Sequence, residues 1–138
     1  MTYSSEYTEK LRKSGLRPTK QRINICEVLF DTKNTFHFTI SDLVKIIQTK
    51  ANQKISLATV YNTVHAFQKK GYLKEIAINS SQTYYDTNTT EHHHFFDENQ
   101  KELIDLQDDD VQPIKIKKTI PGKKIKSVEV LVRVNSDI

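Results

Sequence analysis

The residues best suited to chemistry lie in one stretch rich in histidine and acidic side chains, residues 86–105. It contains three consecutive histidines, His92, His93 and His94, of the five in the sequence. Imidazole nitrogens and carboxylate oxygens are ligands that divalent zinc, iron and manganese accept. On a strand His92 and His94 would point one way and His93 the other, because side chains alternate between faces. The stretch predicts a divalent metal site; a solvated polar loop or a tag-like run is the alternative.

The elements that must hold this stretch are short. Residues 103–106 are predicted to form a strand, and residues 128–134 alternate Val128, Val130, Val132 and Val134 with other side chains, which predicts the clearest strand of the chain. Residues 114–125 are rich in lysine and are interrupted by a Pro-Gly pair. Roughly 50 residues bury little core alone, so we expect residues 87–138 to be a small α/β unit that oligomerises.

Helical patterns fill the first half of the chain. Apolar residues recur at spacings of three and four over residues 7–14, 20–31, 40–50 and 57–70. Thr19, Thr39 and Ser56 stand where an N-cap side chain would begin the last three helices. Two strand-like runs follow, residues 73–78 and 83–86, with a polar turn between them. Helices followed by a hairpin are typical of the winged-helix arrangement.

Charge is divided unevenly along the chain. Residues 1–76 carry 13 Lys and Arg against 6 Asp and Glu, a net charge of +7, whereas residues 77–138 carry 8 against 11, a net charge of −3. A basic half joined to an acidic half is typical of a nucleic-acid-binding module attached to a module with another task. Merely uneven surface charge is the alternative.

One face of the predicted helix at residues 57–70 fits a DNA groove. Its expected buried stripe is Leu57, Val60, Val64 and Phe67. The opposite side carries hydroxyls, amides and an aromatic ring: Thr59, Tyr61, Asn62, Thr63, His65, Gln68 and Lys69. Such side chains contact base edges and thymine methyls in the major groove. Lys74, on the predicted hairpin, would reach phosphates. An ordinary solvent-exposed face is the alternative.

Composition excludes several classes of protein. Cys26 is the only cysteine, so neither an internal disulfide nor a multi-cysteine zinc site is possible, and we expect Cys26 to be packed inside its helix. The sequence has no run of about 18 apolar residues, so no transmembrane helix is predicted. The first residues lack a secretory pattern. We therefore expect a cytoplasmic protein that does not bind membranes.

Three motifs resemble the ferric uptake regulator superfamily. They are GLRPTKQR at residues 15–22, SLATVYNTV at residues 56–64 and the histidine cluster. Within the superfamily, residues 56–62, YYDTN at residues 84–88 and HHHFF at residues 92–96 look most like the iron response regulator branch, which is tied to haem as well as iron. The resemblance implies an α+β dimeric repressor. An N-terminal winged helix-turn-helix DNA-binding domain over residues 1–86 would precede a small α/β dimerisation and metal-sensing domain over residues 87–138.

The resemblance also implies roles for individual residues. The family's regulatory metal site matches His37, Asp86, His92, His94 and Asp105, which would bind Fe²⁺, Mn²⁺ or Zn²⁺. Its groove-reading tyrosine matches Tyr61, and its minor-groove basic residue matches Arg17. Lys20, in the same motif as Arg17, is expected to contact DNA with Thr59, Asn62 and Thr63. The implied partner is double-stranded operator DNA, expected to be A/T-rich.

The sequence departs from the family's pattern in three places. The first pair of the paired Cys-x-x-Cys zinc positions falls on Asp97 and Gln100, so no cysteine zinc site is expected. Asn62 stands where many relatives have arginine after the groove tyrosine. Cys26 precedes Glu27 rather than proline, so the Cys-Pro haem motif of some iron response regulators is absent.

A haem response would therefore rest on His92, His93 and His94. His93 is the first candidate, because it should face away from its neighbours and lie beside Phe95 and Phe96. A supporting or dimer-interface role for His93 is the alternative.

The combined prediction is a metal- or haem-responsive transcription regulator of iron homeostasis that binds operator DNA as a homodimer. A plain divalent-metal-sensing repressor without a haem response is the alternative. A metalloenzyme would need a further acid, base or oxyanion group, and none is apparent. A metal-dependent interaction protein would lack the steep salt dependence of DNA binding.

Overall fold

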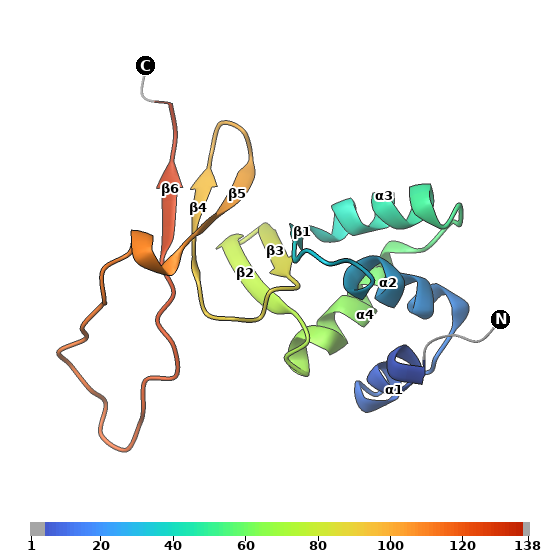
Figure 1. Ribbon diagram of the computed structural model, residues 1–138, viewed down its shortest axis with the longest axis horizontal. Helices are drawn as coiled ribbons and strands as arrows, with labels where there is room; N and C mark the ends of the chain where they lie inside the picture. Colours follow the sequence, from blue (N-terminus) through green and yellow to red (C-terminus); the bar gives the residue numbers. More distant parts are fainter. Residues whose placement is uncertain (1–4, 137–138) are drawn as a thin grey trace. The chain divides into compact units, whose positions relative to one another are not determined.

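The chain folds into two compact units, Met1–Thr89 and Thr90–Ile138, in a computed structural model that describes residues 5–136. The first unit is mainly helical with a small sheet, and the second is built on strands (Figure 1). This mixture of helix and sheet agrees with the α+β prediction for the chain, but the α/β prediction for residues 87–138 is wrong in its helical part, because the described residues 90–136 contain strands and a 3₁₀ turn and no α-helix. The division falls three residues beyond the expected boundary at residue 86.

Four helices form most of the first unit: α1 (Ser5–Lys13), α2 (Lys20–Phe30), α3 (Ile40–Lys50) and α4 (Leu57–Lys69). The side chains predicted as caps begin three of them. Thr19 accepts from the N–H of Arg22, and Ser56 accepts from that of Thr59. Thr39 exchanges two hydrogen bonds with Asp42 in a capping box. Each such cap is worth about 1 kcal/mol, so these starts follow from neighbouring residues alone.

The core of the first unit lies where the helices meet. Val60, Val64 and Phe67 of α4 are fully buried, as predicted. Cys26 of α2 is also fully buried within this core and is a packing residue. Leu57 was expected in the same stripe but is 61% exposed. As the first residue of α4 it lies on the outermost turn, before the helix reaches its neighbours.

The sheet of the first unit contains β1 (His37–Phe38), β2 (Lys74–Asn79) and β3 (Gln82–Asp86), in the antiparallel order β1-β3-β2. The β2–β3 hairpin is the predicted one. Its turn is held by the Asn79 side chain, which accepts from the N–H of Ser81 at 2.9 Å. The pairing sets His37 opposite Asp86, although the two are 49 positions apart in the sequence.

The second unit contains β4 (His93–Asp97), β5 (Glu102–Leu106), the 3₁₀ turn η1 (Asp108–Asp110) and β6 (Leu131–Val134). β4 lies in the centre, antiparallel to β5 and parallel to β6. The β4–β5 turn closes on Asp97, whose carboxylate accepts from the N–H groups of Asn99 and Gln100.

The last strand is shorter than predicted, because regular pairing starts at Leu131 rather than at residue 128. The N–H of Val130 donates to the side-chain Nδ1 of His93 at 2.9 Å. The N–H of Val130 is therefore bonded to a side chain rather than to a carbonyl of the neighbouring strand. None of the helices within residues 5–136 is both long and apolar enough to cross a membrane.

Candidate functional site

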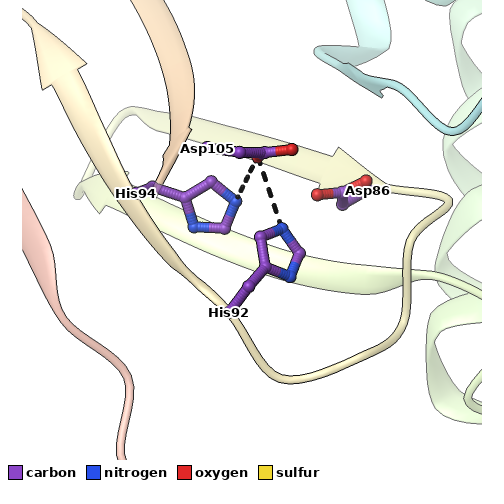
Figure 2. A group of neighbouring side chains, drawn as sticks. All are labelled: Asp86, His92, His94 and Asp105. Carbon is purple, nitrogen blue, oxygen red and sulfur yellow. Dashed lines mark ion pairs between the residues drawn. The ribbon is translucent and has the colours of Figure 1, made fainter. Parts of the chain in front are cut away.

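The second unit brings two histidines and one carboxylate together. His94 lies on β4 directly opposite Asp105 on β5, and His92 immediately precedes β4. Nε2 of His94 is 3.2 Å from Oδ1 of Asp105, and Nε2 of His92 is 3.4 Å from the same oxygen (Figure 2). The centroids of the two imidazole rings are 4.4 Å apart. His92 and His94 therefore share one side, as the sequence predicted.

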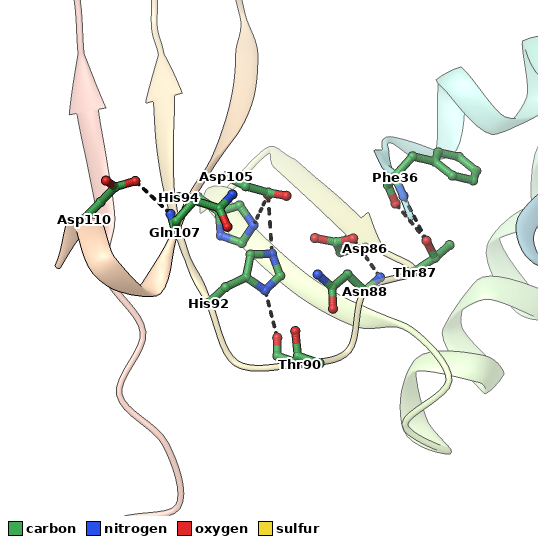
Figure 3. Close-up of polar contacts among 10 residues, drawn as sticks. All are labelled: Phe36, Asp86, Thr87, Asn88, Thr90, His92, His94, Asp105, Gln107 and Asp110. Carbon is green, nitrogen blue, oxygen red and sulfur yellow. Dashed lines mark hydrogen bonds and ion pairs between the residues drawn. The ribbon is translucent and has the colours of Figure 1, made fainter. Parts of the chain in front are cut away.

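The orientation of His92 suits a metal ligand. Its Nδ1 is 2.8 Å from the backbone carbonyl oxygen of Thr90 (Figure 3). A carbonyl only accepts, so Nδ1 carries the proton and Nε2 of the neutral ring keeps its lone pair. Metal-binding histidines are commonly oriented by such a bond. Sequence reasoning missed Thr90, because a contact through a backbone carbonyl leaves no signal in residue type.

The spacing and burial of these groups fit a cation. The donor atoms of His92, His94 and Asp105 lie within 4.8 Å of one another. Ligand atoms bonded to one ion at about 2.1 Å lie roughly 3.0–3.4 Å apart. Both rings are buried, whereas the Asp105 side chain is 38% exposed. Two adjacent buried imidazolium ions would repel, but two neutral rings and a carboxylate around a divalent ion would not.

The other two predicted ligands, His37 and Asp86, belong to the first unit. They are partners across β1 and β3, and Thr87 extends the pairing through hydrogen bonds with Phe36. Asp86 is buried, and its Oδ1 accepts from the N–H of Asn88 at 2.9 Å. Each unit thus holds part of the predicted ligand set in a defined arrangement.

His93 is placed differently from its neighbours. Its Nδ1 accepts from the N–H of Val130, so the proton of the neutral ring sits on Nε2. Neither nitrogen then offers a lone pair to haem iron. His92 and His94 direct Nε2 toward Asp105. This arrangement gives no support to the predicted haem role of His92, His93 and His94, which stays a prediction.

The predicted DNA-binding residues of α4 separate into exposed and buried ones. Tyr61 is 49% exposed, Asn62 is exposed and Thr59 is half-buried. Thr63 was expected on the same face but is fully buried, and its hydroxyl donates to the carbonyl of Thr59 at 2.8 Å. Thr63 therefore belongs to the core and does not contact a ligand from this position. Its i−4 hydrogen bond satisfies the hydroxyl inside the protein.

A basic hollow lies beside the start of α4. It encloses about 510 Å³ and is lined by Arg17, Thr19, Lys20, Gln21, Arg22 and Thr59. The guanidinium of Arg22 donates to the backbone carbonyl of Arg17 at 2.9 Å, which fixes the Arg22 side chain against the connector before α2. The predicted contacts Arg17 and Lys20 therefore join Thr59 at one site, where cations and hydroxyls fit a phosphate.

Lys74 lies away from the turn of the hairpin. It starts β2 opposite Asp86, whereas the turn is at the other end of the strand. A second hollow, of about 480 Å³, lies between Tyr61, the start of α3 and the hairpin turn, with Ser41 and Gln82 in its lining. The hairpin turn thus presents neutral polar groups beside Tyr61 rather than a lysine.

A helical unit with an exposed polar helix face and a small sheet with a histidine–carboxylate cluster are the parts expected of a metal-responsive transcription regulator. A model described as "Ferric uptake regulator family" matches residues 13–133. The chain belongs to the ferric uptake regulator family, whose members are transcription regulators and not enzymes.

Two curated relatives carry names that refer to peroxide. The peroxide operon regulator of Bacillus subtilis (strain 168) is 33% identical over 101 residues, which cover 73% of this chain and 68% of the relative. The peroxide-responsive repressor PerR of Staphylococcus epidermidis (strain ATCC 12228 / FDA PCI 1200) is 31% identical over 101 residues, covering 73% and 65%. The aligned stretch thus spans about two thirds of each relative.

Solved structures of the family share the fold. The ferric uptake regulator from Pseudomonas aeruginosa with manganese superposes with a TM-score of 0.67 at 20% identity, over 96% of this chain and 98% of that one. The Vibrio cholerae ferric uptake regulator gives a TM-score of 0.69 at 20% identity, over 94% and 98%.

Proposed function

We propose that this chain is a homodimeric repressor whose first unit binds operator DNA and whose second unit dimerises and responds to a divalent metal ion. The observation that carries the proposal is the convergence of Nε2 of His92 and His94 on Oδ1 of Asp105. Thr90 sets the ring of His92 in the tautomer that a metal requires.

In the first unit we assign a winged helix-turn-helix. The α4 helix is the recognition helix, because its exposed face carries Tyr61 and Asn62 and its start adjoins the basic hollow. Cations in this hollow hold the phosphates, and Tyr61 contacts base edges or thymine methyls. The β2–β3 hairpin is the wing. Arg17 favours A/T-rich operators if it enters the narrow minor groove.

His37 and Asp86 are proposed to complete the ligand set with His92, His94 and Asp105. His92 follows Asp86 by six positions, so the chain keeps the two residues within about 20 Å of each other. An ion that binds both sets restricts the angle between the units. Metal binding then changes the affinity for DNA, because only some angles let a dimer reach two half-sites.

Nitrogen and oxygen donors without a thiolate suit Fe²⁺ and Mn²⁺. Zn²⁺ is expected to bind more tightly in vitro, since divalent affinities follow the Irving–Williams order and the cell selects by availability. A regulatory role in iron homeostasis is compatible with this donor set.

The names of the curated relatives favour a second candidate signal, peroxide. In this version the bound ion makes the regulator sensitive to peroxide, because Fe²⁺ is readily oxidised. The haem response implied by the iron response regulator branch has no support in these relatives' names or in the geometry of His93.

One experiment tests these proposals in sequence. Metal-free protein is titrated with Mn²⁺, Fe²⁺ without oxygen, or Zn²⁺, and binding to duplexes selected from a random pool is followed by fluorescence anisotropy. We expect the affinity for the selected duplex to change at least tenfold on metal binding. Unchanged affinity with every metal would refute the metal response.

Peroxide is then added to the Fe²⁺ and Mn²⁺ forms. Loss of the metal-dependent change in the Fe²⁺ form alone supports the peroxide candidate. Equal behaviour of both forms supports a plain metal sensor.

A further inference from the structure

The segment between η1 and β6 is an exposed arm of unusual composition. We name residues 111–127 the Ile-Lys arm. It contains six lysines and no acidic residue. Within the described residues 111–130 there is neither helix nor strand, and Figure 1 shows the arm as an open loop leading to β6. Four isoleucines are exposed along it: Ile114 by 42%, Ile116 by 49%, Ile120 by 67% and Ile125 by 56%.

The tip of the arm has a defined conformation. The N–H of Lys123 donates to the carbonyl of Ile120 at 3.0 Å, and Gly122 has φ +77°. Pro121 and Gly122 occupy the two central positions of this turn, and the positive φ of Gly122 is what a type II turn requires. The turn sets one limb before Pro121 and one after Gly122, each with isoleucine between lysines. Such a segment presents apolar and cationic groups to the same partner.

The sheet of the same unit carries a matching surface. Phe95 pairs with Ile104 on β5 and with Val132 on β6, so these three side chains share one face. Val134 shares it through its pairing with Asp97. Ile104 is 41% exposed and Val134 is 36% exposed. This apolar sheet face therefore remains accessible in the single chain.

Acidic groups border this face at the hairpin end. Asp97 and Glu102 are paired on it, and Glu98 follows in the turn. Outside the arm, residues 90–110 and 128–138 contain ten acidic and two basic residues. The arm and the rest of its unit are thus opposite in charge, and both expose apolar side chains.

We propose that the Ile-Lys arm of one copy packs across the apolar sheet face of a second copy, and that the exchange is reciprocal. The inference rests on the proposed homodimer and names the surface that holds it together. Isoleucines cover Phe95, Ile104 and Val132, while lysines approach Asp97, Glu98 and Glu102. A two-fold symmetric pair uses each arm and each face once.

Other occupants fit the arm less well. DNA phosphates would attract the lysines but leave the isoleucines and the sheet face in water. The chain's own sheet face does not take up the arm, because both surfaces are exposed in the same molecule. A second copy would bury the apolar side chains of both the arm and the sheet face and would pair their opposite charges.

The test uses charge reversal in the full chain. The arm variant carries K115E, K117E and K118E, and the face variant carries E98K and E102K. Asp97 is kept, because its carboxylate holds the β4–β5 turn. Sedimentation equilibrium gives the dimer dissociation constant of each variant. We expect each to rise at least tenfold, since like charges now meet across the contact.

Mixing the two variants tests directly whether the arms exchange between copies. In a mixed pair, the acidic arm of one copy meets the basic face of the other, and the remaining arm and face keep their wild-type attraction. We expect an equimolar mixture to form heterodimers with near wild-type affinity. If each variant is monomeric and the mixture stays monomeric, the arm does not exchange and the proposal is overturned.

A variant that replaces two of the arm's isoleucines with serine, I116S with I120S, tests the apolar contact. It should also weaken the dimer by roughly tenfold. K33E, a lysine exposed in the first unit, is the charge control and should dimerise normally. Circular dichroism and Mn²⁺ binding check folding. The proposal is overturned if the arm variant dimerises as tightly as wild type. It is also overturned if the arm variant loses affinity for DNA and not for its second copy. A wild-type protein that is monomeric at all concentrations would instead refute the proposed homodimer.

Discussion

The ring of Tyr61 stacks on the ring of His65, with centroids 5.7 Å apart and planes inclined by 9°. The two residues are four positions apart on α4, so their side chains lie on one face of the helix. The stack restricts the rotamers open to Tyr61. The i, i+4 spacing is visible in the sequence, whereas the stacking of the two rings is seen only in the structure.

Replacing Tyr61 with alanine should reduce discrimination between the selected duplex and a scrambled one. The expected loss is roughly 1–3 kcal/mol if the ring makes specific base contacts. His65→Ala should cause a smaller loss, and His65→Phe should retain most of the discrimination because it keeps an aromatic partner. Competition anisotropy measures both quantities. If Tyr61→Ala distinguished the selected duplex from the scrambled one as well as wild type does, α4 would not be the recognition helix.

Replacing Arg17 with alanine should weaken binding to A/T-rich duplexes and lower the salt dependence. The slope of log affinity against log salt should fall by about one ion, because one phosphate contact is lost. Lys20→Ala should behave similarly, since both residues line the same hollow. Thr63→Val should leave DNA affinity unchanged, because Thr63 is buried. An unchanged slope for Arg17→Ala and Lys20→Ala would place the phosphate contacts elsewhere.

Replacing His92 or Asp105 should weaken Mn²⁺ binding by at least about tenfold. The fold should persist, because neither residue belongs to the main hydrophobic core. His93→Ala is the matched control: it removes the acceptor for Val130 but no proposed ligand, so metal affinity should stay near the wild-type value. Isothermal titration calorimetry on metal-free protein gives these affinities. Equal Mn²⁺ affinity of His92→Ala and wild type would show that the metal site lies elsewhere.

The buried thiol makes stability fall at alkaline pH. Burial raises the pKa of Cys26 to about 12 from an ordinary value of 9.0. The folded state therefore stays protonated between these values while the unfolded state loses its proton, so stability falls as pH rises through this window. Burial also raises the pKa of Tyr84 and Tyr85.

Guanidinium unfolding at pH 7.5, 9 and 10 checks this expectation. Cys26→Ala should be less stable at pH 7.5 but should lose less stability on going to pH 10. The native thiol should react slowly with iodoacetamide at pH 8 and rapidly in denaturant. Rapid reaction of the native protein would show that Cys26 is accessible.

The starts of the helices were determined by the sequence on its own. Thr19, Thr39 and Ser56 cap helices through hydrogen bonds to residues three positions ahead, so every partner is a near neighbour in the chain. The same holds for the extended alternation that predicted His92 and His94 on one side, although β4 itself begins at His93. Local periodicity and local hydrogen bonding suffice for such predictions.

Other features were decided only by the tertiary structure. Whether Thr63 is buried depends on what packs against α4, and the length of β6 depends on a side chain of β4 that takes the Val130 N–H. The pairing of His37 with Asp86 and of His94 with Asp105 depends on strand register. Register reflects the packing of whole sheet faces, which no short stretch of sequence contains.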